Sequence, residues 1–441
     1  MSEYKTPTTP QEVQANFEQI HPLMSKSEAY YESSRCLYCY DAPCTQACPS
    51  DIDIPLFIRQ INNENLKGSA KTIYESNYFG NVCGKVCPTE VLCEGACVHN
   101  HQNVKPIEIG RLQSYATTNA INKETKLFKM ADANGKKVAV IGAGPAGISC
   151  ACELRMHGYA VDVYEAKAQP SGLSLYGCAP YKITNDEILA EMDYLQKQFG
   201  FAVHYNQPIK SGEQIHRLEQ QYDAIFLGIG LGATSSIRIK GEDMNNCIGA
   251  TEFIEQVKLD PLSVKLGDRV IVIGGGNTAM DAASEAARLG AQNVILAYRR
   301  DKSAMRAYDF EYELAKQVGV VGWFNVQPLE IKGMNEVEGV RFIRTKIENG
   351  NATGIPDSEF DQACDLLILA TGQSKQINFL QKITGMTWDK KGRIEINAQT
   401  RQTSNPKYFA GGDATNGGAE VVNASAEGKA AAKGIHQFLS A

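Results

Sequence analysis

Residues 137–147 read KVAVIGAGPAG, an apolar strand that runs directly into a glycine-rich turn. The turn fits the G-x-G-x-x-G fingerprint of dinucleotide-binding folds, and its glycines are Gly142, Gly144 and Gly147. The first glycine permits a tight turn, the second lets the backbone approach a pyrophosphate, and the third allows a helix to pack closely. Glu165 ends the next strand, 21 residues after Gly144, where a carboxylate would accept hydrogen bonds from a ribose. This stretch predicts an α/β nucleotide-binding domain rather than a glycine turn without a ligand.

A second apolar strand, residues 269–273, opens another fingerprint. Alanine stands at its third glycine position, which the fingerprint allows, and its residues are Gly274, Gly276, Asn277, Thr278 and Ala279. The strand that follows ends in Arg299 and Arg300 instead of an acid, and Arg306 comes soon after them. Guanidinium groups suit a 2′-phosphate and are poor partners for a bare ribose. The pattern favours NADPH over NADH; the alternative is a solvated surface of arginines.

Two further strands set the order of the domains. Residues 222–228 and 365–372 are apolar strands that end near glycine, so each would close one nucleotide domain beside its ligand. Residues 408–413, YFAGGD, then return to the chemistry of the first domain. Asp413 could bind the ribityl hydroxyl of a flavin, and a helix starting near Val421 would direct its N-terminus at a reduced flavin ring. The alternative is a helix-capping Asp413 in an exposed turn.

We therefore expect FAD in the first nucleotide domain and NADPH or NADH in the second. The fold class is α/β with an N-terminal all-α iron–sulfur domain and two Rossmann-like, three-layer nucleotide domains, the NAD(P) domain being inserted in the FAD domain. The expected divisions are 1–130 for the helical domain, 131–254 for the first part of the FAD domain, 255–373 for the NAD(P) domain and 374–441 for the second part of the FAD domain.

The iron–sulfur prediction rests on cysteine spacing. Eight of the 13 cysteines fall in the first hundred residues, as C-x2-C-x4-C-x3-C-P, then C-x3-C-P and C-x3-C. They are Cys36, Cys39, Cys44, Cys48, Cys83, Cys87, Cys93 and Cys97. Soft thiolates stabilise iron, and a 4Fe-4S cluster needs four ligands. Zinc and unliganded thiols are the alternatives, but three successive short spacings crowd one tetrahedral zinc site. The first run departs from the bacterial cluster signature at its x4 spacing.

Other classes of function find no support. No C-x-x-C pair lies near the flavin domain, which argues against a disulfide reductase, and no H-E-x-x-H or G-x-S-x-G pattern supports hydrolysis. A net charge of −6 does not suit nucleic-acid binding, and no run of 18 apolar residues suggests a membrane span. The polar N-terminus does not resemble a secretory signal, so we expect a cytoplasmic protein. Hydride transfer is mainly positioning, so no catalytic acid or base is assigned.

The cysteine-rich region, the FAD fingerprint, the inserted NAD(P) fingerprint and the terminal Gly-Gly-Asp together resemble a known reductase portion. It is shared by dihydropyrimidine dehydrogenase and the glutamate synthase small subunit, and the resemblance covers nearly the whole chain. Residues 109–113, IGRLQ, look like the pyrimidine branch, in which a glutamine ligates a cluster. Residues 86–97, with VCPT and LCEGAC, also look like that branch.

The resemblance implies two ligand sets. One cluster would be held by Cys36, Cys39, Cys44 and Cys97, and the other by Cys48, Cys87, Cys93 and Gln113. Cys83 would then be a structural thiol, whereas spacing alone would use all eight cysteines. Without the family, Gln113 would be expected as an exposed helical glutamine.

The same resemblance implies further cofactor-binding residues. Arg299 and Arg306 would bind the NADP phosphate, and Thr371 and Gly372 would lie near the nicotinamide. The flavin would be bound in addition by Gly172, Leu173, Lys182, Gly412, Glu420 and Val421. Relatives often carry arginine where this chain has Lys182, which keeps the positive charge but cannot form a bidentate contact.

The function implied is that of an NAD(P)H-oxidising subunit of bacterial dihydropyrimidine dehydrogenase. It would pass electrons through FAD and two 4Fe-4S clusters to an FMN-containing partner that reduces uracil or thymine to the 5,6-dihydropyrimidine. The alternatives are the glutamate synthase small subunit, which serves a large amidotransferase subunit, a related carrier reductase, and a non-catalytic redox sensor with structural clusters.

Overall fold

The computed structural model describes residues 3–440, which divide into two compact units. The smaller unit comprises residues 3–19, 176–181 and 232–374, and the larger unit comprises residues 20–175, 182–231 and 375–440. Each unit contains one five-stranded sheet. No helix within residues 3–440 is both long and apolar enough to cross a membrane.

The sheet of the larger unit is parallel throughout, in the order β14-β4-β1-β2-β3. Its strands are β1 (Lys137–Ile141), β2 (Ala160–Tyr164), β3 (Ala202–His204), β4 (Ala224–Leu227) and β14 (Tyr408–Ala410). The helices that accompany it are α8 (Pro145–Met156), α9 (Leu173–Gly177), α10 (Asn185–Phe199), α11 (Gly212–Gln221), α15 (Ile377–Leu380), α16 (Asp413–Asn416) and α17 (Val421–Ser440). Every residue of β4 is buried, as expected for a parallel strand covered on both faces, and every residue of the edge strand β14 is buried as well.

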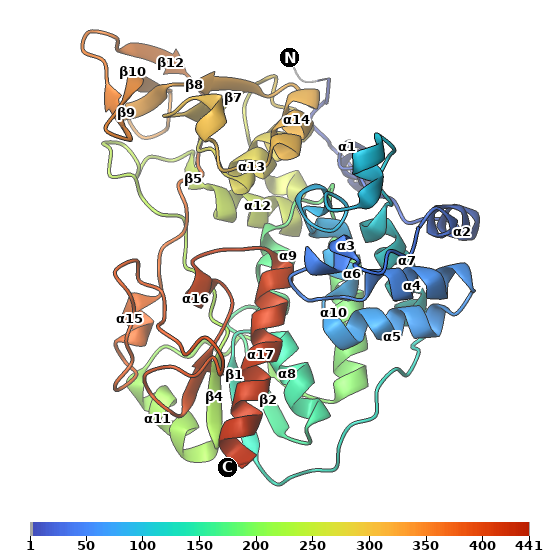
Figure 1. Ribbon diagram of the computed structural model, residues 1–441. Coiled ribbons are helices and arrows are strands. Elements are labelled where there is room, and N and C mark those ends of the chain that lie inside the picture. Colours follow the sequence, from blue (N-terminus) through green and yellow to red (C-terminus); the bar gives the residue numbers. More distant parts are fainter. Residues whose placement is uncertain (1–2, 441) are drawn as a thin grey trace. The chain divides into compact units, whose positions relative to one another are not determined.

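Helices α8 and α17 run side by side against this sheet (Figure 1). Glycine permits their close approach, because a Cβ on Gly428 would stand 2.0 Å from the Ala146 carbonyl oxygen. This packing brings the start of α17 next to the turn that precedes α8.

The first part of the larger unit is helical, as the sequence predicts. Its helices are α2 (Lys26–Ser34), α3 (Pro43–Gln46), α4 (Ile54–Asn62), α5 (Leu66–Ser76), α6 (Gly80–Val86) and α7 (Ile109–Asn122), with 3-10 turns η1 (Thr89–Val91) and η2 (Val98–Gln102). The apolar stripe of α4, with Phe57 and Ile58 fully buried, packs with Ile73 and Leu112 into one core. Cysteines of both runs pack against or within this core.

The sheet of the smaller unit has the order β5-β13-β6-β7-β8 and is also parallel. Its elements are α1 (Pro10–Asn16), β5 (Cys247–Gly249), α12 (Ala250–Leu259), η3 (Pro261–Ser263), β6 (Arg269–Ile273), α13 (Asn277–Arg288), β7 (Asn293–Tyr298), η4 (Lys302–Ala304), α14 (Asp309–Gln317), β8 (Val321–Phe324) and β13 (Leu366–Leu369). A second, antiparallel sheet is made by β9 (Val326–Lys332), β10 (Gly339–Glu348), β11 (Asn351–Gly354) and β12 (Phe360–Ala363).

The order of strands along the chain reproduces the expected insertion. All strands of the smaller unit fall between β4 and β14, which are neighbours in the first sheet. Strand β5 pairs with β13 although it precedes residue 255, and residues 3–19 belong to the smaller unit. In that unit the Arg288 guanidinium donates to the Asn16 carbonyl oxygen at 2.6 Å, which holds α1 against α13.

Candidate cofactor sites

The turn between β1 and α8 has the geometry of a pyrophosphate cradle. Gly142 has φ +101°, and a Cβ there would stand 2.3 Å from the Gly228 carbonyl oxygen. A Cβ on Gly147 would stand 1.9 Å from the Gly142 carbonyl oxygen. Gly144 differs, because its nearest atom would be the Gly172 Cα at 3.9 Å. Two glycines therefore shape the turn, and the middle one leaves open space beside its backbone.

Acidic side chains brace both sides of this turn. Glu165 is buried and accepts hydrogen bonds from the backbone N–H groups of Ala143 at 2.7 Å and Lys167 at 2.8 Å. Glu427, on α17, accepts the Gly412 N–H at 2.7 Å and so fixes the loop before α16. Burial raises the pKa of the Asp413 carboxyl, and the Ala419 N–H bonded to it acts in the opposite direction.

The remaining residues expected at the flavin lie on the same unit. Gly172 has φ +51°, directly after Ser171 with φ +80°, and Leu173 begins α9. Lys182 is buried, and Val421 begins α17 directly after Glu420. The hydroxyl oxygens of Ser171 and Ser174 are buried without a hydrogen-bond partner within residues 3–440. Polar atoms left in this state are typical of a site built for a polar ligand.

The second glycine turn repeats this geometry in the smaller unit. A Cβ on Gly274, which has φ +158°, would stand 2.5 Å from the Ala370 carbonyl oxygen, whereas a Cβ on Gly276 would meet nothing within 4 Å. The side chain of Asn277, which begins α13 ahead of Thr278 and Ala279, accepts the Tyr308 N–H at 3.0 Å. Gly372, with φ +89°, also faces open space, and the Thr371 hydroxyl donates to the Ser235 carbonyl oxygen.

Three arginines gather beside this second turn. Arg299 and Arg300 directly follow β7, and the Arg306 N–H donates to the Gly275 carbonyl oxygen at 2.9 Å. Arg299 and Arg306 are exposed. Within residues 3–440, none of the three forms an ion pair with an acid. Guanidinium groups that form no ion pair suit a phosphate dianion.

In the helical region the cysteines surround two cavities. The first cavity is lined by Cys36, Cys39, Cys44 and Cys97 together with apolar residues of α4 and α7. The second cavity is lined by Cys48, Cys83, Cys87, Cys93 and Gln113, among other residues. The structure thus brings together each of the two expected ligand sets, with Cys83 as an additional neighbour of the second.

Several of these thiols have a raised pKa, so their ionisation is unfavourable without a bound metal. Burial raises the pKa of the Cys44 thiol to about 11 and that of Cys93 well above its usual range. The pKa of Cys87 is also raised, first by its hydrogen bond with Cys83 and then by burial. Burial raises the pKa of Cys48, whereas the backbone N–H groups of Ile52 and Ser50 bonded to it lower it. Because bound metal deprotonates its thiol ligands outright, the donor set fits a metal centre.

No group of three or more His, Cys, Asp or Glu side chains in the described chain could hold a single metal ion. The ligands of a 4Fe-4S cluster bind four different irons, so they surround a larger space than the ligands of one ion.

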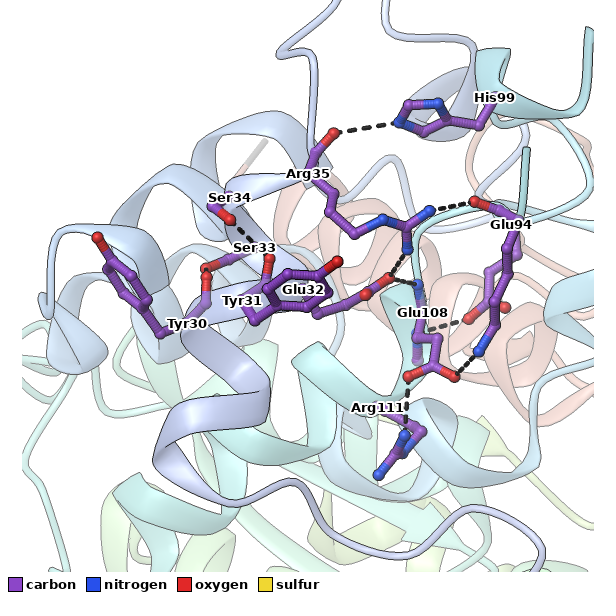
Figure 2. A network of polar contacts seen from close by, with 12 residues as sticks. Tyr30, Tyr31, Glu32, Ser33, Ser34, Arg35, Glu94, His99, Glu108 and Arg111 are labelled. Atoms are coloured by element: carbon purple, nitrogen blue, oxygen red, sulfur yellow. Dashed lines mark hydrogen bonds and ion pairs between the residues drawn. The ribbon is translucent and has the colours of Figure 1, made fainter. Parts of the chain in front are cut away.

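A polar network braces the wall of the first cavity (Figure 2). Glu32 is buried, and its carboxylate accepts hydrogen bonds from the Arg35 guanidinium at 2.6 Å and from the Glu108 N–H at 2.9 Å. The hydrogen bond between Glu32 and Glu108 ties α2 to the start of α7, where Glu108 also pairs with Arg111 at 2.7 Å. His99 lines the cavity, and its Nε2 lies 3.1 Å from the Arg35 carbonyl oxygen, so that nitrogen carries the hydrogen.

The second cavity depends on a close crossing of α6 and α7. A Cβ on Gly84 would stand 2.8 Å from the Gly110 carbonyl oxygen, and a Cβ on Gly110 would stand 2.7 Å from that of Gly84. Gln113 is buried, and its Nε2 donates to the Gly80 carbonyl oxygen at 2.7 Å. Since the amide nitrogen is used there, the oxygen is the atom of Gln113 left for a ligand role.

The sequence patterns did not predict several residues that line or stabilise these sites. Asn77 lines the second cavity and is 1% exposed, and His99 lines the first. Glu427 holds Gly412, and Glu191, on α10, accepts the Asn81 and Val82 N–H groups at the start of α6, at 2.6 and 3.0 Å. The only available signal was the pair of glycines Gly84 and Gly110, which indicates that backbones approach closely.

Two protein families match successive parts of the chain. Residues 13–125 match the family described as dihydropyrimidine dehydrogenase domain II, 4Fe-4S cluster, and residues 136–428 match the pyridine nucleotide-disulphide oxidoreductase family. These matches confirm the expected fold class and the iron–sulfur nature of the helical region.

Relatives of the chain include subunits of two different enzymes. The chain is 32% identical to the glutamate synthase (NADPH) small chain of Escherichia coli (strain K12), over 96% of this chain and 94% of the relative. It is 31% identical to the NAD-dependent dihydropyrimidine dehydrogenase subunit PreT of the same strain, over 96% of this chain and 97% of the relative. Among solved structures, Mycobacterium tuberculosis FprA in complex with NADPH is similar with a TM-score of 0.58. The similarity covers 69% of this chain and 84% of FprA at 18% identity, so it supports only a shared fold.

Proposed function

The chain belongs to the pyridine nucleotide-disulphide oxidoreductase family, with a 4Fe-4S domain ahead of it, and from this premise we propose that it is the NAD(P)H-oxidising subunit of a dihydropyrimidine dehydrogenase. It is an FAD- and NAD(P)-dependent oxidoreductase by family. The proposal adds two clusters and an FMN-containing partner subunit that reduces uracil or thymine. The observation that carries it is the pair of sulfur-lined cavities in a chain that also holds two nucleotide turns.

The chain's own residues would bind and orient the two nucleotide cofactors. When bound, FAD would supply the ability to accept a hydride and to donate single electrons, and iron–sulfur clusters would supply one-electron transfer. The open backbone at Gly144 would cradle the FAD pyrophosphate, with Glu165 holding the turn. The open backbone at Gly276 would do the same for the nicotinamide nucleotide. No side chain is needed as an acid or base for hydride transfer.

The pyrimidine branch is supported by Gln113. Its side chain lines the second cavity with Cys48, Cys87 and Cys93, and it is buried where an ordinary helical glutamine would be exposed. In the pyrimidine branch that the sequence resembles, a glutamine is a cluster ligand. PreT, a relative over nearly all of this chain, is a named dihydropyrimidine dehydrogenase subunit.

The second candidate is a glutamate synthase small chain. A relative with that name is equally similar and is designated NADPH-dependent, and the unpaired arginines beside the second turn favour NADPH. The PreT relative is designated NAD-dependent. Nucleotide preference and partner are therefore separate parts of the proposal and need separate tests.

The partner test uses anaerobically purified protein and a pull-down from the native host. NAD(P)H oxidation by the recovered complex is measured with uracil and, in parallel, with glutamine plus 2-oxoglutarate. Uracil-dependent oxidation with FMN in the partner is the expected result. Oxidation that requires glutamine and 2-oxoglutarate would replace the first candidate by the second. Absence of NAD(P)H-dependent dye reduction by the FAD-loaded protein would favour the redox-sensor alternative.

The nucleotide test compares Arg299→Ala and Arg306→Ala with wild type. Losing one charge-assisted hydrogen bond to a 2′-phosphate costs about 1.5–3 kcal/mol, so the KM for NADPH should rise roughly 10- to 150-fold, with the KM for NADH unchanged. Lys302→Ala, a neighbouring exposed cation paired with Glu313, is the control. Equal effects on both nucleotides would remove the assignment to a 2′-phosphate.

The proposal includes a cytoplasmic setting, where thiols stay reduced, and the four-part division of the chain. Residues 232–374 belong to the smaller unit and β5 pairs with β13, which argues for moving the border at 254 to residue 232.

A further inference from the structure

Asn77 occupies an unusual position in the wall of the second cavity. It caps the end of α5, is 1% exposed, and lines the cavity beside Cys48, Cys83 and Cys87. Its side-chain nitrogen is buried and has no hydrogen-bond partner within residues 3–440. A buried amide donor without an acceptor is rare and costly, so its presence points to an acceptor that occupies the cavity.

The orientation of the amide is fixed by its other end. Asn77 Oδ1 accepts the Phe79 N–H at 3.0 Å and the Ser425 hydroxyl at 2.7 Å. A backbone N–H can only donate, so the atom that faces it must be the oxygen. The nitrogen, with two hydrogens, is therefore the atom left for the cavity.

A chain of hydroxyl groups extends from this amide to the nucleotide-binding helices. Ser425 lies on α17, and because it donates to Asn77 it accepts from Ser149 of α8 at 2.8 Å. Both serines are buried. Helices α8 and α17 begin at the Gly144 turn and at Val421, where the proposed function places FAD. Val422, the next residue of α17, lines the second cavity itself.

We propose that Asn77 donates a hydrogen bond to a sulfur of the cluster in the second cavity and thereby sets that cluster's reduction potential. The proposal rests on the proposed function, because it requires a cluster in that cavity. Reduction adds negative charge to the cluster, so a donor to its sulfur binds the reduced form more strongly. Removing the donor lowers the potential of this cluster. The hydroxyl chain fixes the donor relative to the two helices that start at the flavin.

The test measures reduction potentials of the anaerobically purified holoprotein. EPR-monitored titration with dithionite and mediators gives the potential of each cluster in wild type, Asn77→Ala and Ser425→Ala. Asn77→Ala should shift one cluster signal to a more negative potential and leave the other unchanged, with iron content retained. Ser425→Ala keeps the donor and breaks only the hydroxyl chain, so it should lower thermal stability while both potentials stay at wild-type values.

Other outcomes overturn the proposal. Two cluster signals with wild-type potentials in Asn77→Ala would show that the amide is structural only. An equal shift in Ser425→Ala would assign the effect to the fold. Should Asn77→Ala lose iron, Asn77→Leu gives the measurement, because its side chain is of similar size, carries no charge and lacks the donor; an unshifted potential there overturns the proposal. Wild-type protein with fewer than two cluster signals would instead contradict the proposed function.

Discussion

The two cysteine-lined cavities are built in different ways. Three of the four cysteines of the first cavity come from one short segment, residues 36–44, and its other walls come from residues 54–58, 96–99 and 107–109. The second cavity collects its walls from residues 48–54, Asn77, residues 83–93, residues 110–113 and Val422. Leu37 and Tyr40, in the loop of the first cavity, are exposed, whereas Asn77, Gln113 and Val422 are buried.

This difference separates local from non-local construction. A loop with closely spaced thiols supplies several ligands at once, so spacing indicates that they act together, although the full ligand set, with Cys97, was implied only by the family resemblance. A cavity assembled from helices that cross depends on packing, and its ligands depend on which side chains the packing brings inward. The second cavity should therefore be the more sensitive of the two to changes in the surrounding fold.

The largest effect is expected from removing one ligand of each cavity. Cys44→Ser should lose the cluster of the first cavity and Cys87→Ser that of the second, so each variant should retain about half of the wild-type iron and labile sulfide. NAD(P)H-dependent reduction of FAD should persist in both, which stopped-flow absorbance would measure. Loss of all iron in either variant would contradict two independently held clusters.

The next prediction concerns the eighth ligand. If Gln113 ligates, Gln113→Ala should weaken metal binding in the second cavity at least about 10-fold, whereas Cys83→Ala should keep the cluster and change only stability. Iron content and the EPR spectrum report both. Gln113→Glu keeps an oxygen donor and serves as the matched control. The reverse pattern, with iron lost in Cys83→Ala, would make Cys83 the ligand.

The same contrast explains what could be predicted from the sequence. The glycine turns after β1 and after β6 were predicted directly, because strand, turn and helix are contiguous in the sequence there. The insertion of the NAD(P) domain in the FAD domain was also predictable, because the strand before Asp413 repeats the chemistry of the first domain. These features depend on neighbours in the sequence.

Residues that act across the fold gave no such signal. Asn77 reaches the second cavity only because α5 ends beside it, and Glu427 reaches the Gly412 N–H only after α17 folds back on α16. Strand β5 pairs with β13, which follows more than a hundred residues later, so it belongs to the parallel sheet of the smaller unit. The border at 254 was drawn on local pattern alone and left β5 with the FAD domain. Gln113 was identified through a family resemblance and not through spacing.

A smaller effect should follow from separating α6 and α7. In Gly84→Ala the added Cβ would stand 2.8 Å from the Gly110 carbonyl oxygen, and relief of that overlap costs about 1–3 kcal/mol. The free energy of unfolding should fall, and iron should be lost selectively from the second cavity. Gly212→Ala is the control, because its Cβ would meet nothing within 4 Å. Unchanged stability and iron in Gly84→Ala would show that the second cavity tolerates movement of its helices.

The smallest effect concerns a buried acid that holds α6. Glu191 is fully buried, and burial raises its pKa to about 7 although the Val82 and Asn81 N–H groups act in the opposite direction. Between pH 4.5 and 7 the folded state holds a proton that the unfolded state releases, so the free energy of unfolding falls as pH rises and levels off above the folded pKa. Integrated over pH 6 to 8, this amounts to about 1 kcal/mol. Glu191→Gln cannot titrate and should lack this decline in anaerobic denaturant titrations, while the exposed control Glu213→Gln should keep it. If wild type and Glu191→Gln show the same pH dependence, the start of α6 is not held by a titrating acid, and the second cavity depends less on distant packing than its construction indicates.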